Sequence, residues 1–222
     1  MRVLVTAGGT EEPIDGVRRL ANLSTGATGA TIAAHFAERG AAVLLLHGER
    51  AAPCDASVEC ESFLTFGDLE AALRRRLGNE RWDAVIHLAA VSDYSVVSLE
   101  VDGVPMAAGN RGKIGTGREV VIRLEANPKL IDSLKEWSVT GDVQIVGFKL
   151  TDDPDPMSRD RQVRALLDRG TVDFVVHNDV SEITADRHEA AIWGPEGPIA
   201  WTHTKRELAE ALFEHVSNGV FA

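Results

Sequence analysis

The sequence lacks several features that would place a chain in a functional class. Its 222 residues include two cysteines, one tyrosine and 5% aromatic residues. No apolar run approaches the length of a membrane-spanning helix, so we expect no membrane partner. Basic residues are also few, because 23 lysines and arginines face 34 aspartates and glutamates, for a net charge of −11. This acidic balance disfavours a protein that binds nucleic acid without sequence preference.

The cysteines and histidines show no spacing typical of a metal site or a catalytic thiol. Cys54 and Cys60 form no C-x-x-C motif, and the seven histidines form no H-x-x-x-H or H-E-x-x-H motif. We therefore predict no metal-ligating residues. Because Met1 leads directly into a predicted core strand, no secretory signal is expected and a cytoplasmic location follows. In that compartment we expect both cysteines to be free thiols.

Two common nucleotide-binding motifs are missing, G-x-G-x-x-G and G-x-x-x-x-G-K-[ST], but glycine turns of another spacing are present. The first predicted strand, Val3–Thr6, runs into Gly8-Gly9, and a second turn with Gly26 and Gly29 opens a helix. Glycine lets the backbone approach an anion, and the free N–H groups of a helix start point at it. The two turns therefore predict phosphate sites at the end of the first strand.

Strand and helix signals alternate along most of the chain. The predicted strands cover Val3–Thr6, Ala42–His47, Ser57–Glu61, Ala84–Leu88, Glu119–Leu124, Val143–Lys149 and Val172–Val176, with a hairpin of Ala190–Trp193 and Pro198–Trp201. The predicted helices cover Gly29–Arg39, Asp68–Leu77, Pro128–Trp137, Ser158–Arg169 (with Ser158 as N-cap) and Lys205–Val216. This order predicts an α/β fold, a Rossmann-like parallel sheet with helices on both faces.

Residues 95–120 interrupt the alternation, because glycines and polar residues dominate and no helix signal appears. Asp102-Gly103 suggests a hairpin turn within this segment. We predict one domain over residues 1–222, with 95–120 as an irregular flap or dimer-contact insertion. Polar residues collect where the predicted strands end, and in an open α/β sheet these ends share the edge at which ligands bind.

An ordered set of motifs resembles the phosphopantothenate–cysteine ligases over nearly the whole chain. The motifs are Val5-Thr6-Ala7-Gly8-Gly9-Thr10, Pro13-Ile14-Asp15, Val17-Arg18, Asn22-x-Ser24-x-Gly26-x-x-Gly29, Ala89-Ala90-Val91-Ser92-Asp93-Tyr94, Gly112-Lys113-Ile114, Asn127-Pro128, Val146-Gly147-Phe148 and Asn178-Asp179-Val180. With no decarboxylase sequence ahead of Met1, the chain is similar to the stand-alone bacterial form. A separate decarboxylase that acts next in the pathway is then implied.

The resemblance implies amide formation in two steps for coenzyme A biosynthesis. The carboxylate of 4′-phosphopantothenate attacks CTP to give an acyl-cytidylate and pyrophosphate, and the amine of L-cysteine then displaces CMP. Positioning and charge neutralisation dominate such chemistry, so no acid–base set is required. Magnesium is expected to arrive with the nucleotide, because no carboxylate cage is visible in the sequence. A homodimer, with the active site completed by the partner subunit, is also implied.

The resemblance further implies roles for individual residues. Asn22 and Lys113 are the expected catalytic residues, with the lysine reaching the nucleotide phosphates. The expected nucleotide-binding residues are Gly8, Gly9, Thr10, Ala89, Asp93, Asn127, Pro128, Phe148 and Asn178. The expected phosphopantothenate-binding residues are Ser24, Gly26, Gly29 and Ala90.

Several positions depart from the family pattern and leave alternatives open. Ala27, Gly115 and Thr116 stand where long-form relatives carry basic residues, and His177 stands where alanine is usual. ATP in place of CTP is therefore an alternative. A short-chain dehydrogenase is a second alternative, although Ser98 stands where its lysine would follow Tyr94. A nucleotide-binding module without catalysis is a third.

Overall fold

A computed structural model describes residues 1–53, 55–109, 112–184 and 187–220 of the chain. Its body is built on one eight-stranded sheet with the order β13-β12-β11-β10-β6-β1-β4-β5. The strands are β1 (Arg2–Ala7), β4 (Ala42–Gly48), β5 (Glu59–Phe63), β6 (Ala84–His87), β10 (Gln144–Thr151), β11 (Phe174–Asp179), β12 (Ala190–Gly194) and β13 (Gly197–Thr202). The pairs from β11 to β5 are parallel, while β12 pairs antiparallel with β11 and with β13.

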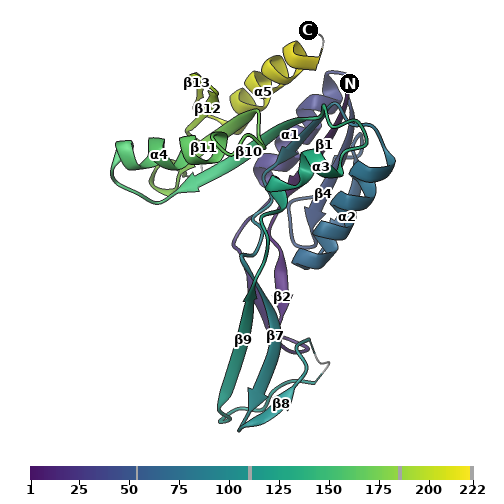
Figure 1. Cartoon of the computed structure of the whole chain (residues 1–222), viewed down its shortest axis with the longest axis vertical. Coiled ribbons are helices and arrows are strands. Elements are labelled where there is room, and N and C mark those ends of the chain that lie inside the picture. The colour runs from purple at the N-terminus through teal and green to yellow at the C-terminus, as the bar shows by residue number, and fades with distance from the viewer. Residues whose placement is uncertain (54, 110–111, 185–186, 221–222) are drawn as a thin grey trace.

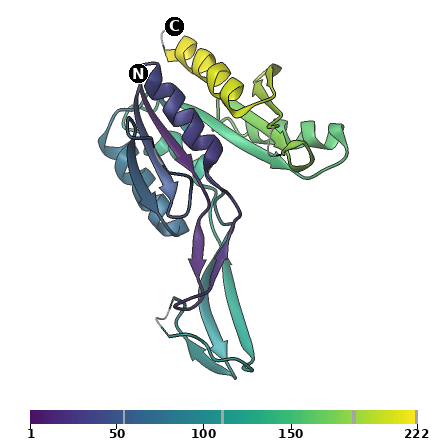
Figure 2. The same ribbon diagram turned by 180° about the vertical axis from the view of Figure 1, so that it is seen from behind.

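Helices cover both faces of this sheet (Figures 1 and 2), as the sequence predicts. The helices α1 (Ala27–Glu38) and α5 (Lys205–Val220) pack on one face, and α2 (Phe66–Asn79), α3 (Leu134–Trp137) and α4 (Pro156–Leu167) pack on the other. A hydrophobic core lies on each face of the sheet, and β1 contributes to both. Val3 and Val5 face α1, while Leu4 faces α2. Such two-sided burial explains why the central strands are continuous apolar runs.

A slender arm extends from the body, below the main sheet in Figure 1. It contains a hairpin of β2 (Glu11–Pro13) and β3 (Arg19–Ala21), and a three-stranded sheet of β8 (Val104–Met106), β7 (Tyr94–Val101) and β9 (Val120–Ala126). Asp102 and Gly103, with φ angles of 52° and 76°, form the predicted turn between β7 and β8. Leu99, Val101 and Ile114 make a small core within the arm.

The arm corrects two expectations. The first part of residues 95–120 is not irregular, because it forms the hairpin of β7 and β8 at the predicted turn, whereas the described residues between Met106 and Val120 form neither helix nor strand. The strand predicted at Glu119–Leu124 is β9, which belongs to the arm and pairs with β7 instead of extending the main sheet. Alternation of apolar and polar residues predicts that a strand exists, but it does not predict which sheet the strand joins.

Smaller corrections concern helix starts and a cysteine. The helix predicted at Pro128–Trp137 is a 3-10 turn, η1 (Leu130–Asp132), followed by the short α3. The side chain of Asp155, not Ser158, caps α4, because Pro156 lies at its first turn. Cys60 is in a disulfide, so the expectation of a free thiol is wrong there, while Cys54 lies outside the described residues. None of the helices in the described ranges is long and apolar enough to cross a membrane.

Candidate functional site

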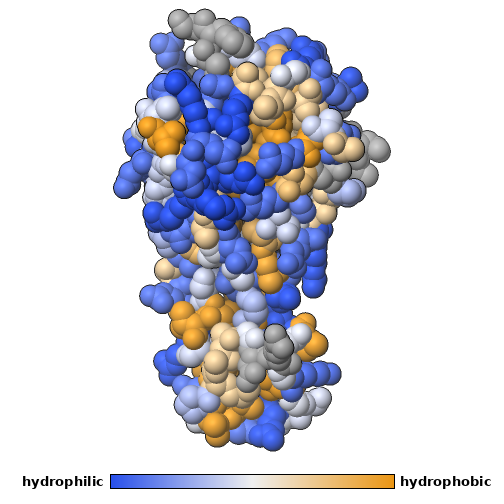
Figure 3. Space-filling view, turned by 90° about the vertical axis from the view of Figure 1, so that its right-hand side faces the viewer, coloured by the Kyte–Doolittle hydropathy of each residue, from blue (hydrophilic) through white to orange (hydrophobic). Residues whose placement is uncertain are grey.

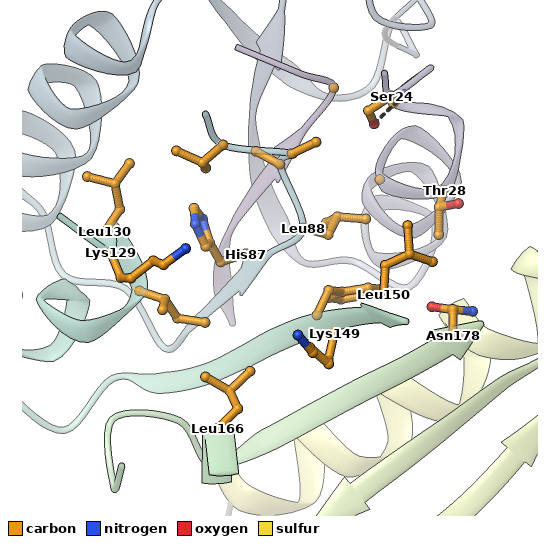
Figure 4. A pocket seen from close by; sticks show the side chains of 18 of the residues that line it. Ser24, Thr28, His87, Leu88, Lys129, Leu130, Lys149, Leu150, Leu166 and Asn178 are labelled. Carbon is orange, nitrogen blue, oxygen red and sulfur yellow. Dashed lines mark hydrogen bonds between the residues drawn. The ribbon is translucent and has the colours of Figure 1, made fainter. Parts of the chain in front are cut away.

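A cavity of about 600 Å³ opens where the carboxyl ends of β1, β6, β10 and β11 meet. The loop before α1 forms one end of its wall, and η1 with α4 forms the other. Figure 4 shows this arrangement, with Ser24 and Thr28 at one end and Lys129 and Leu130 at the other. The sheet edge therefore holds one elongated site into which several chain segments project, as open α/β folds favour.

The N-terminus of α1 forms one end of the cavity and is shaped for close backbone approach. Its N-cap, Gly26, has a φ angle of 70° and supplies no side-chain cap. A Cβ atom at Gly29 would lie 2.4 Å from the Cβ of Ala7, so the helix packs directly against β1. The Ala27 N–H donates to the Thr25 hydroxyl oxygen at 3.4 Å. The N–H groups of Thr28 and Gly29 have no partner among the described residues and are available to an anion in the cavity.

Gly9 and Asn22 lie in backbone contact beside the cavity. A Cβ atom at Gly9 would lie 2.2 Å from the carbonyl oxygen of Asn22, which no other residue type could accommodate. The Asn22 amide nitrogen donates to the carbonyl oxygen of Val91 at 3.0 Å. The next two residues toward α1, Leu23 and Ser24, line the cavity. Asn22 is thereby fixed at the rim, next to the loop that follows β6.

Two polar side chains hold the loop after β6 in place. The Thr10 hydroxyl oxygen accepts from the Ser92 backbone N–H at 2.8 Å. The Asn127 amide nitrogen donates to the Ser92 carbonyl oxygen at 3.0 Å, and its amide oxygen accepts from the Ser95 hydroxyl at 2.8 Å. Thr10 is completely buried. Both residues therefore position the Ala89–Asp93 backbone instead of facing the cavity.

The structure brings most of the predicted site residues to one cavity. The predicted residues in its wall are Gly8, Ser24, Gly26, Gly29, Ala89, Ala90, Asp93, Pro128, Phe148 and Asn178. The predicted residues outside the wall are Gly9, Thr10, Asn22, Asn127 and Lys113. The first four of these touch or support its rim, whereas Lys113 lies in the arm. His177 does not line this cavity either; its ring nitrogen Nε2 lies 2.9 Å from the Thr151 hydroxyl.

Three cations in the cavity wall were assigned no role from the sequence. Lys129 pairs with Asp93, and Arg169 pairs with Asp132 at 3.0 Å. Lys149 forms no hydrogen bond or ion pair with any residue that the structure describes, and it extends into the cavity from β10 (Figure 4). An unpaired ammonium group in a cavity wall is suited to bind an anion. The only sequence signal was the position of Lys149 at a strand end.

His87 is a further unpredicted wall residue, and its burial sets its protonation state. The Thr6 hydroxyl oxygen accepts from the Ala89 N–H at 3.1 Å and lies 2.9 Å from His87 Nδ1. A hydroxyl group both donates and accepts, so this contact satisfies either neutral tautomer of His87. Burial lowers the pKa of His87 to about 4, so the ring is a neutral hydrogen-bond donor near neutral pH.

Burial of His87 predicts a pH-dependent loss of stability. The unfolded histidine takes up a proton below about pH 6.5, whereas the folded one does not until about pH 4. The folded state therefore loses up to about 3 kcal/mol as pH falls through this window. We expect His87→Asn, which can keep the contact with Thr6, to flatten the pH dependence between pH 6.5 and 4. The free energy of unfolding is measured by urea titration at pH 6.5 and at pH 4. If it falls as much in His87→Asn as in the wild type, the prediction is contradicted.

No group of three or more His, Cys, Asp or Glu side chains within the described ranges is arranged to hold a metal ion. Among the residues that the structure describes, Asp93 is the one carboxylate in the cavity wall, and it already pairs with Lys129. These side chains do not suit a metal ion bound permanently by the protein. They suit a metal ion that is coordinated by the phosphates of a ligand and enters with it.

Comparison with known proteins gives one consistent family. Residues 1–220 match the family described as DFP, the DNA/pantothenate metabolism flavoprotein C-terminal domain. The chain is 33% identical over 218 residues to the coenzyme A biosynthesis bifunctional protein CoaBC of Thermococcus kodakarensis, covering 97% of this chain and 50% of that protein. It is 30% identical over 220 residues to CoaBC of Escherichia coli K12, covering 96% and 50%. The chain thus spans about half the length of these curated relatives.

A solved structure has nearly the same architecture. The DNA/pantothenate metabolism flavoprotein from Streptococcus pneumoniae superposes with a TM-score of 0.85 at 29% identity, covering 98% of this chain and 99% of that one. A Cab2 mutant in complex with phosphopantothenate-cysteine superposes with a TM-score of 0.75 at 20% identity, covering 99% and 87%, which shows a shared fold.

Proposed function

Because the chain belongs to the DNA/pantothenate metabolism flavoprotein C-terminal domain family, we propose that it is a phosphopantothenate–cysteine ligase of coenzyme A biosynthesis. The carboxylate of 4′-phosphopantothenate attacks the α-phosphate of CTP, and pyrophosphate leaves. The amine of L-cysteine then attacks the acyl carbon, CMP leaves with the former carboxylate oxygen, and the amine proton passes to solvent. The observation that carries the proposal is the single cavity with an uncapped helix N-terminus at one end and cations at the other.

The wall residues suit this chemistry because two of the three substrates, 4′-phosphopantothenate and CTP, are phosphorylated. The N–H groups of α1 bind a phosphate at one end, and Lys129, Lys149 and Arg169 balance negative charge at the other. The Asn22 amide, at the rim beside Val91, is placed to donate to the acyl oxygen as charge develops. Magnesium bound to the nucleotide phosphates would make pyrophosphate a better leaving group.

Pyrophosphate release tests the reaction and the nucleotide together. The protein is incubated with 4′-phosphopantothenate, magnesium and either CTP or ATP, with and without cysteine. We expect CTP to support pyrophosphate release, and we expect CMP and the cysteine adduct only when cysteine is present. Stronger release with ATP would keep the reaction class and overturn the nucleotide choice. Tight nucleotide binding without release from either nucleotide would favour a module without catalysis.

The proposal also includes a homodimer, since the chain's own Lys113 is not in its cavity wall. All seven residues of β9 are exposed, although four are large and apolar: Val120, Val121, Ile122 and Leu124. Figure 3 shows apolar patches on the arm, at the lower end of the view. An exposed apolar strand of this kind indicates a surface that a partner covers. A second copy of the arm would cover it and would carry Lys113 to the partner's cavity.

Subunit mixing tests this arrangement. Lys113→Met and Asn22→Asp are each expected to be nearly inactive alone, because each removes a catalytic group from every site. If Lys113 acts across the dimer, a mixed dimer has one site with both groups intact. We expect mixing, after subunit exchange, to restore about a quarter of wild-type activity in a random 1:1 assembly. No recovery, with mixed dimers present by native mass spectrometry, would contradict the arrangement.

Lys149 provides a separate prediction on nucleotide binding. We expect Lys149→Met to weaken CTP binding about 10-fold, because an unpaired ammonium group contributes on the order of 1 kcal/mol or more to a phosphate contact. Calorimetric titration measures the effect in the absence of turnover. Arg161→Met is the control. Arg161 is an exposed cation on α4, a helix that contributes other residues to the cavity wall, but Arg161 itself does not line the cavity. Equal affinity of wild type and Lys149→Met would contradict this role.

A further inference from the structure

A buried carboxylate lies at the tip of the β2–β3 hairpin in the arm. Asp15 is only 4% exposed. Its Oδ1 atom accepts from the backbone N–H groups of Val17 and Arg18, at 2.9 and 2.8 Å. Its Oδ2 atom accepts from the Ile114 backbone N–H at 3.1 Å and from the Arg18 guanidinium at 2.9 Å. One side chain thus joins two segments that are about 100 positions apart in the sequence.

The segment that Asp15 holds is the one that carries Lys113. The Gly16 backbone N–H donates to the Gly112 carbonyl oxygen at 3.3 Å, and the Arg18 guanidinium donates to the Ile114 carbonyl oxygen at 3.3 Å. Both neighbours of Lys113 in the chain are therefore tied to the hairpin. The Ile114 side chain is buried in the core of the arm. Lys113 itself is exposed and forms no ion pair within the described ranges.

The charge state of Asp15 suits a fixed anchor. Hydrogen bonds from backbone N–H groups, that of Val17 first, lower the pKa of Asp15, so its carboxylate is ionised near neutral pH. The paired Arg18 guanidinium balances this negative charge. The Lys113 ammonium group is consequently not drawn back to Asp15 and stays available to an external anion.

We propose that Asp15 is a positioning residue for Lys113, fixing the backbone on either side of the lysine so that its ammonium group reaches nucleotide phosphates. The inference rests on the proposed function. A lysine on an untethered loop would lose rotational and translational freedom each time it bound, and the anchor removes much of that cost in advance. The anchor should therefore act on kcat, through the transition state, more than on folding.

A double-mutant cycle of Asp15→Asn and Lys113→Met tests the proposal. The asparagine amide can still accept from Val17 and Arg18, but its NH₂ group cannot accept from Ile114 N–H. We expect Asp15→Asn to lower kcat about 10- to 100-fold with a much smaller change in the KM for cysteine. In the Lys113→Met background the same change should cost less than about 2-fold, since the anchored group is gone.

Asp102→Asn is the matched control. Asp102 also accepts from a backbone N–H, that of Glu119 at 3.0 Å, and also pairs with an arginine, Arg118, but at the far turn of the same arm. We expect this variant to keep wild-type kcat. An equal loss from Asp15→Asn in both backgrounds would overturn the proposal and assign the effect to Arg18 or to arm folding. Full activity of Asp15→Asn would overturn it too. A wild-type protein that forms no product would instead refute the proposed function.

Discussion

Replacing Lys113 with methionine should lower kcat about 10²- to 10³-fold, the effect expected when one charged donor to a developing negative charge is lost. Methionine keeps the length and apolar stem of lysine and removes only the charge. Because the side chain is exposed and unpaired within the described part of the chain, the fold should be unaffected. Steady-state pyrophosphate release with CTP measures kcat, and thermal unfolding checks the fold.

The control for this prediction is another cation of the same arm. Arg118 is 57% exposed in the segment between β8 and β9, so Arg118→Met removes the same charge from the same arm. We expect it to retain kcat within about 2-fold, as surface substitutions usually have small effects. If both variants lose activity equally, the arm acts through its overall charge, and the specific role of Lys113 is wrong. A Lys113→Met protein with near wild-type kcat would refute that role directly.

Replacing Gly9 with alanine should have the second largest effect, a loss of about 100-fold in kcat. The new Cβ atom would lie 2.2 Å from the Asn22 carbonyl oxygen, so the Asn22 backbone must move. That movement would break the 3.0 Å hydrogen bond from the Asn22 amide to Val91, which holds the amide that we propose to be catalytic at the rim. A displacement of about 1 Å can reduce an enzymatic rate by this factor.

Gly67→Ala is the control for Gly9→Ala, because a Cβ atom there would meet only the Thr65 hydroxyl oxygen, at 3.8 Å. Both variants should fold, as judged by circular dichroism, and only Gly9→Ala should lose activity. Normal kcat in a folded Gly9→Ala protein would show that the position of Asn22 is not critical. If Gly9→Ala does not fold at the assay temperature, kcat is measured at a lower temperature at which circular dichroism shows the folded protein.

The main sheet was predictable because its strands are buried on both sides. Continuous apolar runs such as Ala42–His47 and Ala84–Leu88 have few other stable arrangements, and the helices between them are amphipathic. β9 was predictable as a strand but not as part of the arm, because its apolar residues resemble those of a core strand although they are exposed. A strand buried inside a subunit and a strand buried against a second copy have the same pattern of apolar residues in the sequence.

The candidate site was predictable where backbone geometry dictates residue type. Gly9, Gly26 and Gly29 lie where a larger residue would clash or be strained, so their spacing carries the signal. The cations were harder to predict, since Lys129 and Lys149 reach one cavity from η1 and β10 only through the tertiary fold. Most surface lysines are solvated, and sequence alone does not separate these two from the rest.

Attack of the substrate carboxylate on the α-phosphate of CTP, which we propose, would move a carboxylate oxygen into CMP. The most direct measurement uses 4′-phosphopantothenate labelled with ¹⁸O in its carboxylate, together with CTP, magnesium and cysteine. Mass spectrometry of the products then locates the label. We expect one ¹⁸O atom in the phosphate of CMP, because the amine displaces CMP with the bridging oxygen. Label in inorganic phosphate or pyrophosphate, or amide formation with unlabelled CMP, would contradict it.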